Sequence, residues 1–190
     1  GKYEVTNNEY RKMVFGHNSK DFMGCSLNGE RQPVVYVNFD DAKAYATWLT
    51  QRDQERLGGM RYRVISEQEW QTVAQCDDRR EYPWGSSMPP RYGNYSDSVS
   101  VVRGRVGDYT DGFAVTCPVE RSGVNEWGVC GLGGNVWECC ASDASGASIG
   151  ASRGASWNCS DLCYIRCAYR NVTGGSPRNN ISGFRLALSR

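Results

Sequence analysis

Residues 38–76 read NFDDAKAYATWLTQRDQERLGGMRYRVISEQEWQTVAQC, and this stretch decides the fold class. Asn38 can cap a helix that we expect to run through about Leu57. Its apolar positions at helical spacing are Ala42, Tyr45, Ala46 and Leu49. Gly58-Gly59 ends this helix. Residues 66–69, SEQE, form a capping box and predict a second helix. The residues on the inner face of this second helix are Trp70, Val73 and Ala74.

The flanking sequence divides into a helical front and a loop-rich back. Another capping box, TNNE at 6–9, predicts a short helix through about Val14, and residues 33–37, PVVYV, predict a buried strand. Residues 82–190 show no convincing helical period, and Gly, Ser, Asn and Asp separate short apolar runs. We therefore expect one α+β domain over residues 1–190, with the helices early and a loop-rich β region late.

Composition excludes several classes of protein. The chain has 190 residues and 39% hydrophobic content, with 22 Lys plus Arg against 21 Asp plus Glu, a formal charge of +1. That balance argues against nucleic-acid binding and polybasic membrane binding, and no apolar run approaches the roughly 20 residues that span a bilayer. One histidine, His17, excludes His-rich metal sites and most His-based proton relays; it lies in a polar loop, and we expect it to be exposed.

The nine cysteines leave the redox compartment open. Nine is an odd number, so at least one thiol is free or paired outside the chain, and the pairing cannot be read from sequence. Residues 1–5 resemble the inside of a strand and not a signal peptide, so we expect any export signal or membrane anchor to lie outside this chain.

Eight short motifs occur in order along the chain. They are KYEVTN at 2–7 with Tyr10, PV at 33–34, EQEW at 67–70, YPWG at 82–85, PV at 118–119, GNVWE at 134–138, RGASW at 153–157 and GFR at 183–185. Together they resemble the formylglycine-generating-enzyme (sulfatase-modifying factor) family. The resemblance implies an elaborated C-type-lectin-like fold, which agrees with the helical front and loop-rich back.

The resemblance implies three possible functions, because fold alone does not fix function. The family fold hosts copper-dependent oxidases that convert cysteine to formylglycine, sulfoxide synthases of the ergothioneine type, and binding proteins diversified by retroelements. The sulfoxide synthases carry an additional His-bearing iron domain. A chain with His17 alone cannot supply that iron site.

The oxidase alternative depends on cysteines near the C-terminus. Such an oxidase binds copper through two thiolates, and soft sulfur ligands suit Cu(I). This chain has Cys159, Cys163 and Cys167, and the segment Arg166-Cys167-Ala168 resembles one in the family. The spacing is four residues each time, whereas the family pair stands five apart, and one residue displaces a ligand by up to about 3.5 Å. The alternative reading is an oxidase that uses Cys159 and Cys163.

The diversified-binder reading rests on a variable block at about 153–185. Variable proteins of this fold keep a fixed framework within that block. In this chain, the residues that resemble the framework are Arg153-Gly154-Ala155-Ser156-Trp157, Arg166, Ala168, Arg170, Arg178 and Gly183-Phe184-Arg185. Gly175 and Ser182 depart from the usual pattern. We expect the framework arginines to tie carbonyl-rich loops together through their donor forks, and Trp137 and Trp157 to lie in the core beneath the binding face.

Codon arithmetic supports diversification. Mutating the two adenines of an Asn codon with a pyrimidine third base never yields Lys, Glu, Gln, Met or Trp. Residues 1–157 contain 30 of these five types, and residues 158–190 contain none. Template codons that escaped mutation would still encode asparagine, as found at Asn158, Asn171, Asn179 and Asn180.

These observations predict a ligand-binding face and no catalytic centre. Tyrosine offers rigid contact area, and Ser, Gly and Asn offer adaptable hydrogen bonds. With Tyr164 and Tyr169 as anchors, the predicted contact residues are Asn158, Cys159, Ser160, Asp161, Cys163, Tyr164, Tyr169, Asn171, Val172, Thr173, Gly174, Ser176, Asn179, Asn180 and Ile181. For any single residue in this set, the alternative is that it belongs to an ordinary polar surface loop and contacts no ligand. We expect a monomer that binds a protein or other macromolecule on a cell or phage surface, and the resemblance implies display on a bacterial surface.

The resemblance also implies calcium. The side chains of Asn94 and Asp111 and the carbonyls of Tyr95 and Phe113 match one family site, and oxygen ligands suit Ca²⁺. The alternative for Asp111 is an ordinary Asx-turn. A second site would use Gly134, Val136 and Glu138, with its Asn ligand replaced by Gly131.

Overall fold

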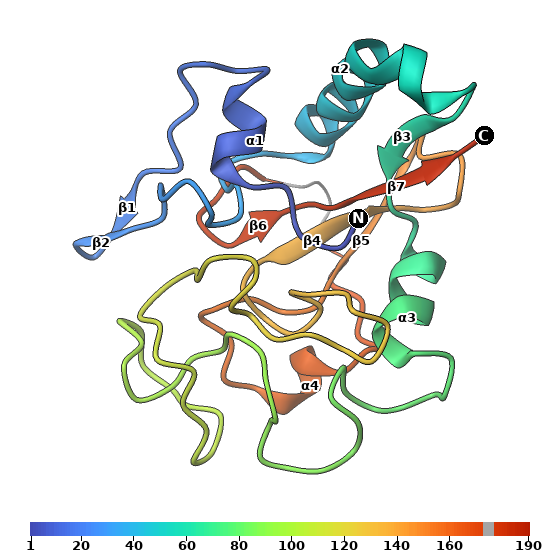
Figure 1. Cartoon of the computed structure of the whole chain (residues 1–190). Coiled ribbons are helices and arrows are strands. Elements are labelled where there is room, and N and C mark those ends of the chain that lie inside the picture. Colours follow the sequence, from blue (N-terminus) through green and yellow to red (C-terminus); the bar gives the residue numbers. More distant parts are fainter. Residues whose placement is uncertain (173–176) are drawn as a thin grey trace.

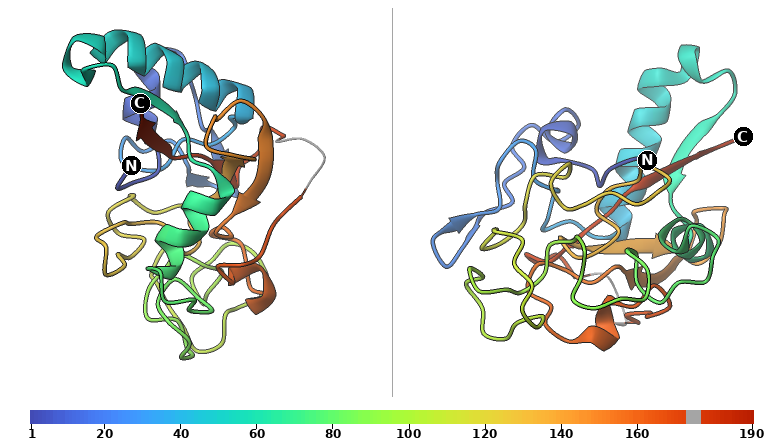
Figure 2. Two further views of the ribbon diagram at one scale, coloured as in Figure 1. Left: turned by 90° about the vertical axis from the view of Figure 1, so that its right-hand side faces the viewer. Right: turned by 60° about the horizontal axis from the view of Figure 1, so that its bottom comes forward.

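The computed structural model describes residues 1–172 and 177–190. Figure 1 shows how the elements are arranged. The elements in chain order are α1 (Asn7–Arg11), β1 (Asp21–Phe22), β2 (Cys25–Ser26), α2 (Phe39–Leu57), β3 (Arg61–Val64), α3 (Glu67–Gln75), β4 (Trp137–Ala141), β5 (Ile149–Arg153), α4 (Leu162–Ile165), β6 (Ser182–Gly183) and β7 (Leu186–Ser189). Figures 1 and 2 show α1, α2 and the β3–β7 pair in one half and long loops with α4 in the other, with α3 alongside the loops.

The predicted helices are present because their ends are encoded locally. Helix α2 follows Asn38, whose side chain accepts from the Asp41 amide, and ends at Gly58, which has a left-handed φ of 55°. Helix α3 has the predicted capping box between Ser66 and Glu69. Helix α1 also has its capping box but ends at Arg11, one turn short of the predicted end.

The strands form three small sheets. Strands β1 and β2 pair with each other, β3 pairs antiparallel with β7, and the third sheet has the order β5-β4-β6. All five residues of the central strand β4 are buried. Strand β6 lies parallel to β4, with Trp137 opposite Ser182 and Glu138 opposite Gly183. The GFR motif at 183–185 therefore leads directly from the central sheet into β7.

Two local predictions are wrong. Residues 33–37 are mostly buried but form no strand: Val34 donates to the carbonyl of Val5, Tyr36 donates to that of Asn179, and Tyr36 has a left-handed φ of 59°. Because successive amides bond to different segments, no ladder forms. Helix α4 lies where no helix was predicted. Its Asp161 cap accepts from the Cys163 amide, a signal too short to stand out.

Buried polar side chains replace strand ladders in the loop-rich half. Each loop amide needs a partner where no ladder supplies one. The carboxylate of Asp97, 2% exposed, accepts from four backbone amides, those of Val99, Ser100, Asp111 and Gly112. Asn125 similarly accepts from two amides and donates to the Val73 carbonyl. These contacts hold the loops against α3 and against one another.

Three further findings bear on function. Within the described residues, no helix is both long and apolar enough to cross a membrane. All nine cysteines fall among those residues, and each carries a free thiol. His17 is half-buried, not exposed as predicted: its Nε2 lies 2.9 Å from the Val35 carbonyl and its ring packs edge-on against Tyr10.

Candidate ligand-binding face

A hollow of about 400 Å³ opens in the loop-rich half beside α4. The residues that line it are Trp137, Asn158, Cys159, Ser160, Asp161, Tyr164, Tyr169 and Asn171. Seven of these eight belong to the fifteen predicted contact residues. The structure therefore brings about half of the predicted set together around one concavity.

Three aromatic residues, Trp137, Tyr164 and Tyr169, are among those that line the hollow. The rings of Tyr164 and Tyr169 lie 4.9 Å apart at 60°, and those of Trp137 and Tyr169 lie 5.9 Å apart at 48°. Tyr164 is 40% exposed and Trp137 only 6%, so the tryptophan is mostly covered and the tyrosine projects. Trp137 and Trp157 are buried, as predicted, but Trp137 also lines the hollow. Sequence reasoning missed that role, because Trp137 stands outside the variable block.

The segment that carries this face is anchored to the rest of the domain at several points. The Cys167 amide donates to the Glu81 carbonyl, and Asn171 pairs with Ser152. The buried guanidinium of Arg153 donates to the Tyr169 carbonyl at 2.8 Å and to the Cys167 carbonyl at 3.3 Å. Exposed side chains on residues 158–172 therefore stand on a fixed backbone.

The other predicted contact residues do not line this hollow. Cys163 and Val172 are exposed. Asn179, Asn180 and Ile181 are half-buried: the Asn180 carbonyl accepts from the Trp157 indole, the Ile181 carbonyl accepts from the Trp137 amide, and the Ile181 side chain packs against buried core residues. Thr173, Gly174 and Ser176 lie outside the described residues.

Four framework arginines bind mainly carboxylates, which corrects the expectation that they tie carbonyls, whereas Arg153 does bind loop carbonyls. Arg166 pairs with Glu81 at 2.7 Å, Arg170 with Glu67 at 2.5 Å, and Arg178 with Asp41 at 2.8 Å. Arg185 also donates to the Cys130 carbonyl, but its main partner is Glu138. Glu67 and Asp41 lie in the first turns of α3 and α2, so these pairs fasten the C-terminal block to the helical front.

The structure does not gather the three candidate copper ligands into one metal-binding cluster among the described residues. Cys159 lines the hollow, whereas Cys163 and Cys167 do not, and Cys159 and Cys167 belong to different core clusters. Burial raises the pKa of the Cys159 thiol to about 11 and that of Cys167 to about 12, which disfavours the thiolates. A two-thiolate copper centre needs both sulfurs on one side of one site.

The first candidate calcium set fits an oxygen-loving cation. Asn94 is fully buried, and its Oδ1 has no hydrogen-bond partner among the described residues. Asp111 accepts from the amides of Tyr95 and Phe113, and the first of these contacts joins the two loop segments that carry the four residues. Burial raises the pKa of Asp111 to about 6. An unpartnered buried amide oxygen and a partly desolvated carboxylate are both groups that suit Ca²⁺, which these residues would hold.

The second candidate calcium set does not fit. Both carboxylate oxygens of Glu138 accept from the Arg185 guanidinium at 2.5 Å, and one also accepts from the Trp70 indole. A Cβ on Gly131 would stand 2.1 Å from the carboxylate of Glu4. The space of the missing Asn ligand is therefore filled by Glu4, and the charge of Glu138 is already compensated.

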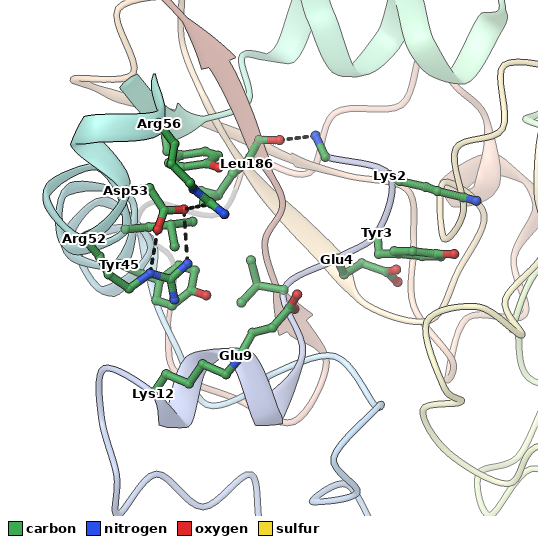
Figure 3. Close-up of a pocket in the computed structure, with 14 residues that line it drawn as sticks. Lys2, Tyr3, Glu4, Glu9, Lys12, Tyr45, Arg52, Asp53, Arg56 and Leu186 are labelled. Atoms are coloured by element: carbon green, nitrogen blue, oxygen red, sulfur yellow. Dashed lines mark hydrogen bonds and ion pairs between the residues drawn. The ribbon is translucent and has the colours of Figure 1, made fainter. Parts of the chain in front are cut away.

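A second hollow of about 340 Å³ lies between α1, α2 and the first residues of the chain, as Figure 3 shows. Its main charged group is internally paired, because Asp53 accepts from Arg52 at 2.8 Å and from Arg56 at 2.9 Å. None of the predicted contact or metal residues lines it. This hollow adds nothing to the predicted site.

Comparisons with known proteins show the family of the chain. A sulfatase-modifying factor enzyme 1-like domain model matches residues 1–190. The formylglycine-generating enzyme of Thermomonospora curvata is 36% identical over 111 residues, or 57% of this chain and 33% of that protein. The inactive C-alpha-formylglycine-generating enzyme 2 of Bos taurus is 33% identical over 129 residues, or 66% of this chain and 38% of that protein.

A solved structure shares the fold across the chain. Treponema denticola variable protein 1 superposes with a TM-score of 0.71 at 20% identity, covering 100% of this chain and 83% of that one. The chain spans about half or less of the length of the curated relatives it matches. Some of those relatives are named as enzymes and others as inactive. The chain belongs to the sulfatase-modifying factor enzyme 1-like family, with the predicted α+β, C-type-lectin-like fold.

Proposed function

We propose that this domain is a ligand-binding variable protein, without a catalytic centre, whose C-terminal block at about 153–185 is diversified by a retroelement. Its ligand is a protein or other macromolecule on a cell or phage surface. The domain acts as a monomer displayed on a bacterial surface. The likeness to a protein named as a variable protein supports the shared fold, and the function is argued from residues below.

One observation carries the proposal, namely the separation of framework and contact positions within the block. The framework residues Arg153, Trp157, Phe184 and Arg185 are at most 2% exposed. Between them, seven of the predicted contact residues line one hollow, and among the predicted contact residues that the structure describes Cys159 is the buried one. A block that must tolerate random side chains needs that division, because core positions do not accept arbitrary residues.

The proposal is tested in the DNA around the gene. We expect a near-copy of the segment that encodes residues 153–185, differing only where the copy has adenines, beside a gene for a reverse transcriptase. Finding it would give the contact residues directly. If the complete surrounding sequence holds no such copy, the retroelement proposal is wrong and the missing residue types are chance.

The oxidase remains the second candidate, because a relative named as a formylglycine-generating enzyme is 36% identical and Cys159 lines the hollow. It predicts stoichiometric Cu(I) uptake that Cys163→Ser abolishes. The binder predicts a folded protein that takes up no stoichiometric copper and tolerates Cys163→Ser. Copper titration of both proteins under reducing conditions, with circular dichroism to check folding, separates the two candidates.

A further inference from the structure

The rings around the hollow are inclined to one another. The angles of 60° between Tyr164 and Tyr169 and of 48° between Trp137 and Tyr169 place aromatic surface on several sides of one small space. No parallel pair offers a slot for a flat ring. A volume of about 400 Å³ is at the small end of the roughly 300–1,000 Å³ usual for ligand pockets, so the space suits one side chain.

A carboxylate stands at this aromatic hollow. Among the described residues that line it, Asp161 is the charged one. Its Oδ1 accepts from the Cys163 amide at 2.8 Å, which fixes the side chain as the cap of α4. Among the hydrogen bonds of residues 1–172 and 177–190, none engages its Oδ2. Within residues 1–172 and 177–190, the carboxylate is therefore held in place by its Oδ1 with its Oδ2 not engaged in a hydrogen bond.

The arginines near this hollow are not among its lining residues. Arg166 and Arg170 are paired with Glu81 and Glu67, respectively. Arg103 and Arg105 flank Gly104, which contacts Ser160, and they are exposed. The charge inside the hollow is thus negative, with cations on the loops around it.

We propose that this hollow binds the cationic side chain, of lysine or arginine, from a protein ligand, an inference that rests on the ligand-binding function proposed above. Cations are attracted to the faces of tyrosine and tryptophan rings, more strongly where water is partly excluded. The mostly covered Trp137 ring provides such shielding, and the carboxylate of Asp161 provides the countercharge. Aromatic rings and a carboxylate together favour a cation over a neutral group of equal size.

The test is an NMR titration of the whole chain with blocked amino acids. Nα-acetyl-arginine amide and Nα-acetyl-lysine amide are the cationic probes, and Nα-acetyl-citrulline amide is the uncharged match to arginine. We expect millimolar binding of the cationic probes, with shifts at the Trp137 indole, and about three- to tenfold weaker binding of citrulline. Added NaCl should weaken the binding of the cations and leave that of citrulline unchanged.

Two matched pairs of proteins sharpen the test. Asp161→Asn removes the charge and keeps a good helix cap. It should therefore weaken the binding of the cationic probes about three- to tenfold and leave the binding of the citrulline probe unchanged. Tyr164→Phe keeps the ring face and should bind the cationic probes as the wild type does. Tyr164→Leu removes the ring and should bind the same probes about two- to fivefold more weakly. Thermal unfolding checks that every variant folds.

Several results would overturn this inference. The first two are equal affinities for the citrulline and arginine probes and an unchanged affinity of Asp161→Asn for the cationic probes. The other two are chemical-shift changes that map away from Trp137 and binding of a neutral methyl glycoside in the hollow where the cationic probes do not bind. Failure here is separate from failure of the proposed function. A retroelement template beside the gene with no cation binding overturns only this inference, whereas the absence of a template overturns the diversified binder itself.

Discussion

Arg185 and Glu138 form an ion pair that is almost wholly shielded from water, with side chains 1% and 0% exposed. Burial raises the pKa of the neighbouring Glu4 carboxyl well above its usual range, so Glu138 is the main countercharge to Arg185 at neutral pH. Arg185→Met should lower the free energy of unfolding by about 3–5 kcal/mol, because it leaves Glu138 buried and uncompensated. Urea unfolding at pH 7 measures this loss.

Arg178 provides the matched control for that measurement. It also pairs with a carboxylate, that of Asp41, but its side chain is 56% exposed. Arg178→Met should therefore cost at most about 1 kcal/mol. Equal losses of unfolding free energy in the two variants would show that burial does not determine how much these ion pairs contribute to stability.

Helix α3 should make stability depend on pH through Glu69. The Arg63 guanidinium, followed by the Ser66 amide and hydroxyl, lowers the pKa of Glu69 from 4.5 to about 2. A lowered carboxyl pKa stabilises the fold above the unfolded value of 4.5, and this stability is lost as the pH falls towards 2. Because Glu69 is 37% exposed, screening reduces the contribution to about 1–2 kcal/mol.

Glu69→Gln isolates this effect, since glutamine also serves in a capping box but carries no charge. The variant should be less stable than the wild type at pH 6, and the difference should shrink as the pH falls from 5 to 2.5. Thermal unfolding across that range measures it. A difference that is the same at every pH would assign the effect to the cap geometry alone.

The same elements show which parts of the fold can be predicted from sequence. Helices α2 and α3 were predictable because capping residues and apolar spacing act within a few residues of each other. The strand expected at 33–37 failed because these residues bond to Val5 and Asn179, partners far away in sequence. A buried, apolar segment looks like a strand in sequence even where its backbone amides bond to several different segments and form no ladder. Helix α4 has four residues, too few to show a period.

The candidate site was predictable for a different reason. Codon reachability marked a set of positions, and seven of them line one hollow, as expected if a diversified surface avoids the core. Trp137 escaped that reasoning, since it reaches the hollow from β4, a buried strand outside the block. Asn179, Asn180 and Ile181 satisfy the codon pattern, but their contacts with Trp157 and Trp137 depend on the folded backbone.

At the scale of the whole molecule, calcium should stabilise the loop-rich half. The four residues of the first site join two loop segments, 94–95 and 111–113, that no strand ladder holds. Calcium at 100 times its Kd should add about 2.7 kcal/mol, seen as a higher Tm than in EDTA. Asp111→Asn should remove the calcium effect, and magnesium should not replace calcium. An unchanged wild-type Tm at millimolar calcium would contradict this site.

The division of the block into framework and face makes its sharpest prediction at two cysteines. Cys159 and Cys167 are both buried, at 7% and 0% exposure, and their thiols resemble each other in size and chemistry. Cys159 lines the hollow, whereas Cys167 packs with Trp70 and Leu132 in the core beneath α3. If the block is diversified from asparagine codons, asparagine must be acceptable at position 159.

Cys159→Asn should therefore cost at most about 1 kcal/mol, because the new amide can reach water through the hollow. Cys167→Asn should cost about 2–3 kcal/mol or more, because it places an amide without partners in an apolar cluster. Urea unfolding of both variants, with Cys163→Asn as an exposed control, measures the difference. Comparable losses at 159 and 167 would place Cys159 in the framework and confine the diversified face to the exposed positions around α4.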